Sequence, residues 1–111
     1  MKEGRFEVEL TRGAEDDLEA IHAYLAEHRS MDASESLLNA FLENISTLER
    51  YPDRGIFPKE LEALGVREFR QILLDPYRLT YRFIGSKVVI LVIADGRRYM
   101  QALLERRLLG R

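Results

Sequence analysis

The stretch from Pro76 to Arg98 constrains the fold most, because it contains two strand patterns separated by a short turn. Residues 77–83 alternate large apolar or aromatic side chains with arginine or threonine, and successive side chains of a strand point to opposite faces. The pair Gly85-Ser86 follows, and glycine tolerates the positive φ that a tight hairpin needs. Residues 88–93 are all apolar, which is typical of a strand covered on both faces. We therefore predict a β-hairpin whose second strand lies centrally in a sheet.

The first half of the sequence predicts a short strand followed by two helices. Residues 5–10 alternate charged and apolar side chains, as a half-buried strand does. Over residues 12–29 apolar side chains recur at intervals of three and four, which indicates an amphipathic helix. A second helical pattern begins near Asp32, where the sequence resembles a capping box, and ends at Tyr51, because a residue before proline is disfavoured in a helix. The short link at residues 30–31 makes the two helices an antiparallel hairpin.

The second half of the sequence predicts three strands and a final helix. A brief helical turn over residues 58–65 precedes a strand over residues 66–74, then the hairpin, and then an amphipathic helix over residues 98–109. The order is β-α-α-β-β-β-α. We predict a single α+β domain over residues 1–111: a small antiparallel sheet, the N-terminal helix hairpin packed on one face, and a C-terminal helix. The last three strands form a meander, while the first strand can join either an edge or the centre.

The composition excludes several classes of protein. The absence of cysteine excludes disulfides, thiolate zinc sites and thiol nucleophiles. The longest apolar run, residues 88–94, is far too short to span a bilayer, and the N-terminus carries acids instead of the apolar run of a secretory signal. We therefore expect a cytoplasmic protein without membrane contact. His22 and His28 lie on one helix but not on one face of it, so we expect no metal site, and nothing in the sequence calls for a cofactor.

Charge is distributed unevenly along the chain. Residues 1–64 contain 7 Lys/Arg and 15 Asp/Glu, whereas residues 65–111 contain 10 Lys/Arg and 4 Asp/Glu. One interpretation is that two acidic helices simply lie beside an ordinary sheet. The other is a polarised molecule whose sheet side attracts an anionic partner.

The order and spacing of several short segments resemble the RelE/ParE superfamily of bacterial type II toxins, often described as plasmid stabilisation proteins. These segments extend over nearly the full chain: AEDDLEAIHAYLAE, LERYPDRG, GVREF, PYRLTYRF, VVILVIADGRR and LLERRLL. The resemblance implies a partner, because such toxins are encoded beside an antitoxin whose C-terminal segment wraps and masks them. It also implies a hetero-oligomer with that antitoxin, and contact with operator DNA only through the antitoxin.

The superfamily divides by mechanism, and the residues favour one branch. RelE-like members resemble ribosome-dependent mRNA endonucleases, whereas ParE-like members are associated with poisoning of DNA gyrase. This sequence keeps two arginines of the RelE pattern, Arg78 and Arg98, which would be catalytic in a nuclease. It lacks the lysines before the hairpin, and Leu104 aligns with a tyrosine or histidine of the final helix, so acid–base groups are missing. The net charge of −2 also suits RNA binding poorly.

We therefore interpret the chain as a ParE-like, non-enzymatic toxin that binds DNA gyrase and is neutralised by a cognate antitoxin. Two alternatives stay open: a RelE-like nuclease with a displaced acid–base partner, and an inactive homologue that only binds its antitoxin. The side chains expected to contact the target are arginines of the sheet half: Arg67, Arg70, Arg78, Arg82, Arg97 and Arg98. Those expected to bind the antitoxin are leucines of the final helix: Leu104, Leu108 and Leu109. Without the resemblance, these arginines would be read as a solvated face.

Overall fold

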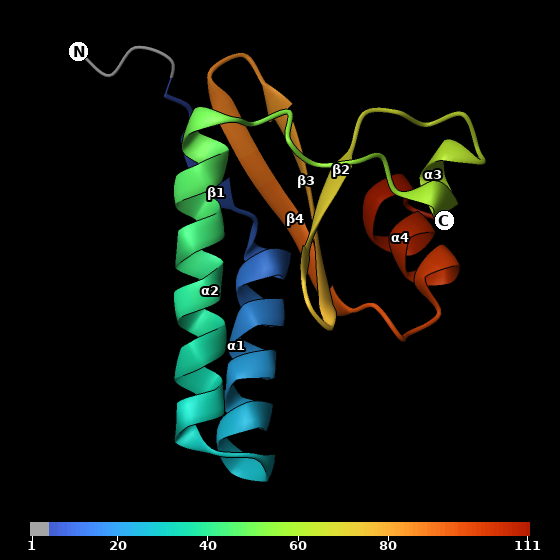
Figure 1. The fold of residues 1–111 in the computed structure, drawn as a ribbon. Coiled ribbons are helices and arrows are strands. Elements are labelled where there is room, and N and C mark those ends of the chain that lie inside the picture. Colours follow the sequence, from blue (N-terminus) through green and yellow to red (C-terminus); the bar gives the residue numbers. More distant parts are fainter. Residues whose placement is uncertain (1–4) are drawn as a thin grey trace.

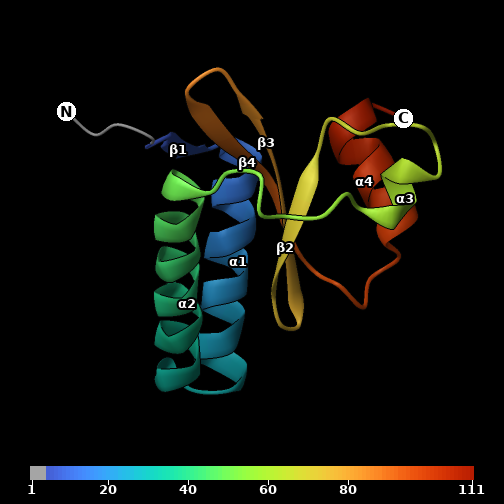
Figure 2. The same cartoon turned by 45° about the horizontal axis from the view of Figure 1, so that its top comes forward.

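The computed structural model describes residues 5–111, and its elements follow the predicted order. They are β1 (Glu7–Leu10), α1 (Arg12–His28), α2 (Met31–Arg50), α3 (Lys59–Glu62), β2 (Arg70–Leu74), β3 (Tyr77–Ile84), β4 (Lys87–Asp95) and α4 (Met100–Leu109). The sheet is the middle layer of the molecule: the α1–α2 hairpin covers one face, and α3 and α4 cover part of the other (Figure 1). Figure 2 shows α3 beside α4 on the side of the sheet away from the hairpin. None of the helices within residues 5–111 is long and apolar enough to cross a membrane.

The four strands are ordered β1-β4-β3-β2, so the apolar strand β4 lies inside the sheet as predicted. The last three strands form the predicted antiparallel meander, and Gly85, with a φ of 60°, makes the turn between β3 and β4. β1 joins the edge beside β4 and runs parallel to it, so the sheet is mixed and not purely antiparallel. A parallel pair needs a long crossover connection, and the chain between β1 and β4 supplies it.

The helix hairpin is confirmed, with one shift at the start of its second helix. The hydroxyls of Thr11 and Ser30 cap α1 and α2 by accepting hydrogen bonds from backbone N–H groups three residues on, at 3.1 and 2.9 Å. The capping-box prediction at Asp32 was wrong, because the Ser30 hydroxyl already reaches the N–H of Ala33 and α2 begins at Met31. The loop between the helices is therefore only two residues long.

The strand predicted over residues 66–74 is shorter than expected, since β2 begins at Arg70. The backbone N–H of Val66 donates to the Leu61 carbonyl at 2.9 Å, which ties this residue to the end of α3 instead of to the sheet. Phe69 then turns its buried side chain toward α4. The residues before Arg70 thus pack as a loop against the α3–α4 side of the molecule.

Two apolar clusters hold the three layers together. The first lies between the helix hairpin and the sheet and includes Phe41, Leu48 and Tyr81. The second lies between the sheet and α4 and includes Val92 and the fully buried Leu104. α4 therefore completes the core on the second face of the sheet.

Candidate functional site

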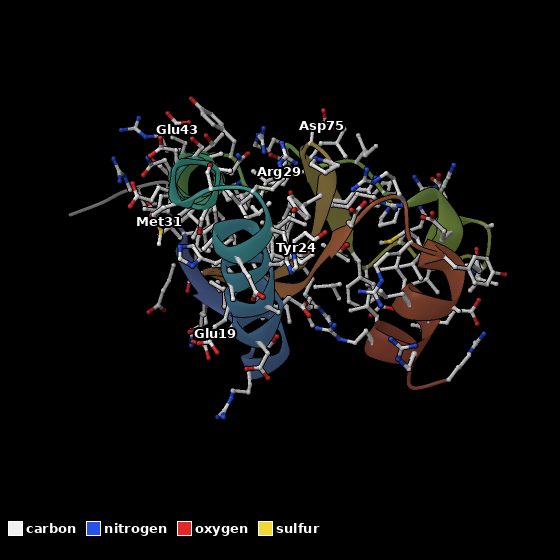
Figure 3. All side chains as sticks on the ribbon, turned by 90° about the horizontal axis from the view of Figure 1, so that it is seen from below. Glu19, Tyr24, Arg29, Met31, Glu43 and Asp75 are labelled. Atoms are coloured by element: carbon white, nitrogen blue, oxygen red, sulfur yellow. The ribbon has the colours of Figure 1, made fainter. Side chains whose placement is uncertain are left out.

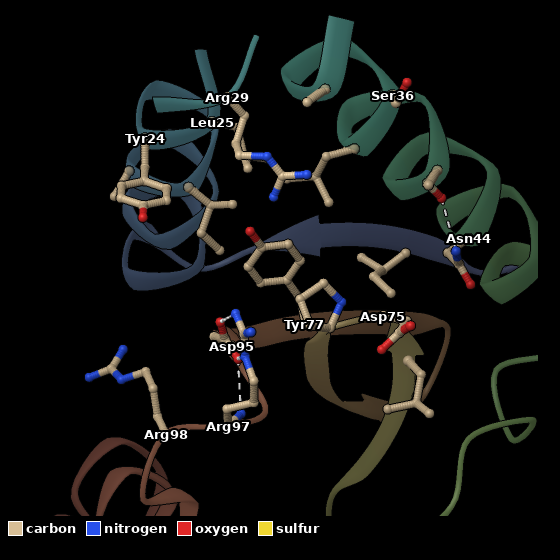
Figure 4. Close-up of a pocket in the computed structure, with 18 residues that line it drawn as sticks. Tyr24, Leu25, Arg29, Ser36, Asn44, Asp75, Tyr77, Asp95, Arg97 and Arg98 are labelled. Carbon is tan, nitrogen blue, oxygen red and sulfur yellow. Dashed lines mark hydrogen bonds and ion pairs between the residues drawn. The ribbon is translucent and has the colours of Figure 1, made fainter. Parts of the chain in front are cut away.

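A groove of about 1080 Å³ lies between the helix hairpin and the end of the sheet that carries the β2–β3 turn (Figure 4). The closed end of the hairpin projects beyond the sheet, so its inner side has no strand opposite it (Figure 1). Seen from below, Tyr24 and Arg29 lie on the side of the hairpin that faces the turn at Asp75, whereas Met31 and Glu43 lie on the far side (Figure 3). The groove is the space that the sheet leaves uncovered.

The floor of the groove is apolar. It is formed by side chains from both helices and from the β2–β3 turn: Ile21, Leu25, Leu37, Ala40, Leu74 and Tyr77. Burial, together with the nearby Asp95 carboxylate, raises the pKa of the Tyr77 hydroxyl above its ordinary value of 10.0. Tyr77 is therefore neutral at physiological pH and presents its ring and an uncharged hydroxyl to the groove.

The rim of the groove carries three arginines beside two aspartates, Asp75 and Asp95. Arg97 is paired with Asp95 by a hydrogen bond of 2.9 Å from its Nε, and this pairing lowers the pKa of Asp95 to about 2. Arg29 and Arg98 also line the groove, and among the residues that the structure describes neither forms an ion pair. Figure 4 shows the Arg29 side chain reaching into the groove above the Tyr77 ring. An apolar floor under a cationic rim suits an amphipathic, acidic segment.

Arg78, one of the arginines expected to contact a target, is buried away from the groove. Its guanidinium donates to both carboxylate oxygens of Glu60 at 2.9 and 2.7 Å and to the Gln71 side chain at 2.8 Å. The residue is only 9% exposed. The hydrogen bonds from Arg78 hold the pKa of Glu60 below its usual value, so this is a charged pair at neutral pH. Arg78 thereby anchors α3 to the sheet, and a target could reach it only by displacing Glu60.

The structure does not bring Arg78 and Arg98 together, although a nuclease of the RelE type would use both. Arg98 lines the groove beside the helix hairpin, whereas the Arg78 guanidinium contacts α3 on the other face of the sheet. Gly96, between them in sequence, packs so closely that an added Cβ would lie 2.9 Å from the Arg78 Cδ. Within residues 5–111 no three His, Cys, Asp or Glu side chains converge as ligands for a metal ion.

The remaining arginines of the expected target-contact set lie beside phenylalanine rings. Arg67 and Arg70 place their guanidinium carbons 4.6 and 4.5 Å from the centre of the Phe57 ring. Arg82 lies 5.6 Å from the Phe69 ring. The six predicted arginines are thus divided among a buried ion pair, the groove rim and an aromatic surface near the start of β2, and contact with a target stays a prediction for them.

The leucines expected to bind an antitoxin are used largely by the fold itself. Leu104 is fully buried in the cluster between α4 and the sheet, so an antitoxin cannot contact it in this conformation. Leu108 and Leu109 are half-buried against the same cluster, and their role in antitoxin binding stays a prediction. The reason for the difference is that amphipathic spacing identifies the apolar side of a helix but not what covers it.

Sequence reasoning missed the groove, including Tyr24, Arg29 and Leu37. The lengths of the predicted elements gave no signal for it, because the strand predicted over residues 66–74 would extend over about 30 Å, as the 20 residues of α2 do. Only the placement of the hairpin against the sheet leaves its closed end without a strand opposite it (Figure 1).

The comparisons with known proteins agree with this architecture. The family model described as ParE toxin of type II toxin-antitoxin system, parDE, matches residues 8–100. A solved structure described as the chromosomal ParDE TA system from P. aeruginosa matches with a TM-score of 0.66 and 20% sequence identity, over 83% of this chain and 97% of that chain. At this identity the structural match shows likeness of fold. No curated protein matches the sequence.

Proposed function

The chain belongs to the ParE toxin family of type II toxin–antitoxin systems, and we propose that it arrests growth by binding DNA gyrase until an antitoxin docks in the groove. The gyrase target is what the ParE branch of the family implies. The antitoxin is the partner that the family description implies, and the groove is the surface best suited to receive it. In this proposal the protein acts by binding its target and not by catalysis.

The observation that carries the antitoxin proposal is the combination of an apolar floor and a cationic rim in one groove. An amphipathic helix places its apolar residues at intervals of three and four, and these would fill the floor beside Leu37 and Leu74. Acidic residues on the flanks of the same helix would meet Arg29 and Arg98, which form no ion pair within the described part of the chain. Docking would then bury apolar surface and pair exposed charges in one step.

The ion pair between Arg78 and Glu60 favours a toxin that binds its target over one that cleaves RNA. In a nuclease this arginine would have to offset charge on the phosphorane, but here both of its terminal nitrogens are bound to Glu60. The position that aligns with a terminal-helix acid–base group is the buried Leu104, which has no proton to exchange. The chain offers cationic surface for contact, and the aligned position in the final helix carries no group that could transfer a proton.

The proposal is tested first by expression in bacteria. The chain is produced alone and together with the product of the adjacent small open reading frame, and growth is followed. We expect growth arrest that the neighbour relieves. The absence of arrest, with intact binding of the neighbour, would show a protein that only binds its antitoxin.

The target is tested with purified components. We expect the protein to inhibit supercoiling by DNA gyrase and to leave mRNA intact on programmed ribosomes. Cleaved mRNA with unaffected supercoiling would replace the gyrase proposal by a nuclease. Addition of the antitoxin should restore supercoiling, because a toxin occupied in the groove is masked.

A further inference from the structure

Arginine and phenylalanine side chains in contact with one another form a row beside the start of β2, outside the groove. Its members are Arg67, Phe57, Arg70, Phe83 and Phe6, and we call this set the Arg–Phe ladder. The Arg70 guanidinium lies 4.5 Å from the Phe57 ring and 5.9 Å from the Phe83 ring, and the Phe83 and Phe6 rings meet edge to face at 6.1 Å. None of the five residues lines the groove.

The ladder keeps its positive charge. Arg70 donates to the backbone carbonyls of Asp53 and Gly55 at 3.2 and 3.0 Å, and these neutral acceptors leave its charge uncompensated. Arg67 forms an ion pair with Glu62 at 3.6 Å, and the Arg67 side chain is 63% exposed. An exposed pair of this kind contributes little and is readily exchanged for another carboxylate.

The ladder also holds its arginines in place before any partner arrives. Each contact between a guanidinium and an aromatic face is an electrostatic attraction to the negative face of the ring. Arginine loses rotamer freedom on binding, so a side chain that is already stacked pays less for being ordered. The exposed Arg67 guanidinium is suited to the two-pronged recognition of a carboxylate, and the half-buried Arg70, whose Nη1 donates to two backbone carbonyls, adds positive charge beside it.

Exposed apolar surface lies beside these charges. Phe83 is itself 37% exposed, and Ile56, which precedes Phe57 in the sequence, is mostly exposed. Arginine and aromatic residues beside exposed aliphatic ones are the composition of energetic centres in protein–protein interfaces. Single-stranded nucleic acid is the less suitable partner, because two guanidiniums already occupy the Phe57 ring on which a base would stack.

We propose that the Arg–Phe ladder is the surface that engages the protein target of the toxin. Carboxylates of the target pair with Arg67 and Arg70, and apolar side chains of the target pack on Phe83. This inference rests on the proposed function as a toxin with a protein target, and it adds a second binding surface that is separate from the antitoxin groove. It also places target recognition on the cationic half of the chain, where residues 65–111 carry 10 Lys/Arg and 4 Asp/Glu.

The test compares Arg67→Glu with Arg12→Glu, which makes the same change in charge at a side chain that is 89% exposed on α1. A third variant, Phe83→Ala, tests the apolar part of the ladder independently. Growth arrest, affinity for gyrase, affinity for the antitoxin and the urea midpoint are measured for each. We expect Arg67→Glu and Phe83→Ala to weaken gyrase binding by about tenfold or more and to relieve the arrest. Antitoxin affinity should stay within about twofold for both, and Arg12→Glu should behave as the unaltered protein.

Three outcomes would overturn the inference. If the unaltered chain arrests growth and both ladder variants do so equally, the target contacts lie elsewhere, while the toxin function stands. If the unaltered chain neither arrests growth nor binds gyrase, the proposed function fails, and the ladder proposal fails with it. If Arg67→Glu abolishes binding to a single-stranded DNA oligonucleotide while gyrase affinity is unchanged, the ladder binds nucleic acid instead of a protein.

Discussion

The carboxylate of Asp17 and the guanidinium of Arg107 close the part of β4 that β1 leaves uncovered. β1 pairs with residues 87–90 of β4 and no further. Beyond that point Asp17 accepts a hydrogen bond from the backbone N–H of Ile93 at 3.0 Å, and Arg107 donates to the Leu91 carbonyl at 3.0 Å. The two side chains also bind each other at 3.1 and 2.9 Å. This pair therefore satisfies an open sheet edge and fixes α1, β4 and α4 to one another.

Loss of this pair should destabilise the whole fold. We expect Asp17→Ala to lower the free energy of unfolding by about 2–3 kcal/mol, because it leaves a backbone N–H and a guanidinium without partners. The Arg107 side chain is 26% exposed and the Asp17 side chain 19%, so the effect stays below that of a fully buried pair. Asp16→Ala is the matched control on the same helical turn, and its exposed pair with Arg12 should contribute at most about 0.5 kcal/mol. Equal shifts of the urea midpoint in both variants would contradict the assignment.

Stability should fall in acid through Glu60 and Asp95. Hydrogen bonds from Arg78 lower the pKa of Glu60 below its ordinary 4.5, and those from Arg97 lower the pKa of Asp95 from 3.8 to about 2. A carboxylate with a lowered pKa in the folded state stabilises the fold above its unfolded pKa and loses this effect as the pH falls through its folded pKa. Unfolding free energies measured by urea titration should therefore be level near neutrality and decline from pH 4.5 downward.

The variant Glu60→Gln separates the contribution of Glu60 to the pH dependence of stability from that of Asp95. At neutral pH the variant should be less stable by about 3 kcal/mol, because the buried Arg78 loses its counter-charge. At low pH the Glu60 carboxyl of the unaltered protein is itself neutral, so the two stability curves should converge. A difference that stays constant at every pH would show that the contact contributes through packing and not through charge.

Much of this architecture could be predicted from local patterns, because periodicity and turn residues act over short distances in sequence. The apolar run of residues 88–93 identified an inner strand, and Gly85 identified the hairpin turn. The same patterns could not identify partners. The alternation over residues 77–83 placed Arg78 and Leu79 on opposite faces of the strand. It could not show that Glu60 would pair with Arg78 and bury it.

The partly wrong expectations for the site have the same physical origin. Asp17 and Arg107 have adequate local explanations as helix-terminus charges, yet they are 90 residues apart and bind each other. Leu104 belongs to the apolar side of its helix, and only the packing of α4 on the sheet shows that this side is already covered. Which polar and apolar groups meet depends on the assembled layers, which local patterns do not encode.

Tyr81 should be required for the loop that precedes α3. Its buried hydroxyl donates to the Pro52 carbonyl at 2.6 Å and accepts from the Gly55 N–H at 3.0 Å. Tyr81→Phe keeps the ring but leaves both backbone groups unpaired, so we expect a loss of about 1–3 kcal/mol in urea unfolding and faster amide exchange at Gly55. Tyr99→Phe, at a largely exposed tyrosine, is the control and should change neither measurement. Unchanged exchange at Gly55 in Tyr81→Phe would exclude this anchoring role.

Antitoxin binding should depend on the two parts of the groove in different ways. Arg98→Glu reverses a charge on the rim, and we expect it to slow association by about tenfold and to reduce the dependence of the rate on salt, since exposed charges mainly steer encounter. Leu37→Ala removes apolar contact from the floor and should instead speed dissociation. Association and dissociation rates measured at low and high salt separate these effects. Arg12→Glu supplies the control for charge. If both groove variants bind normally while Leu108→Asp, still folded, loses the antitoxin, the docking surface is α4 and not the groove.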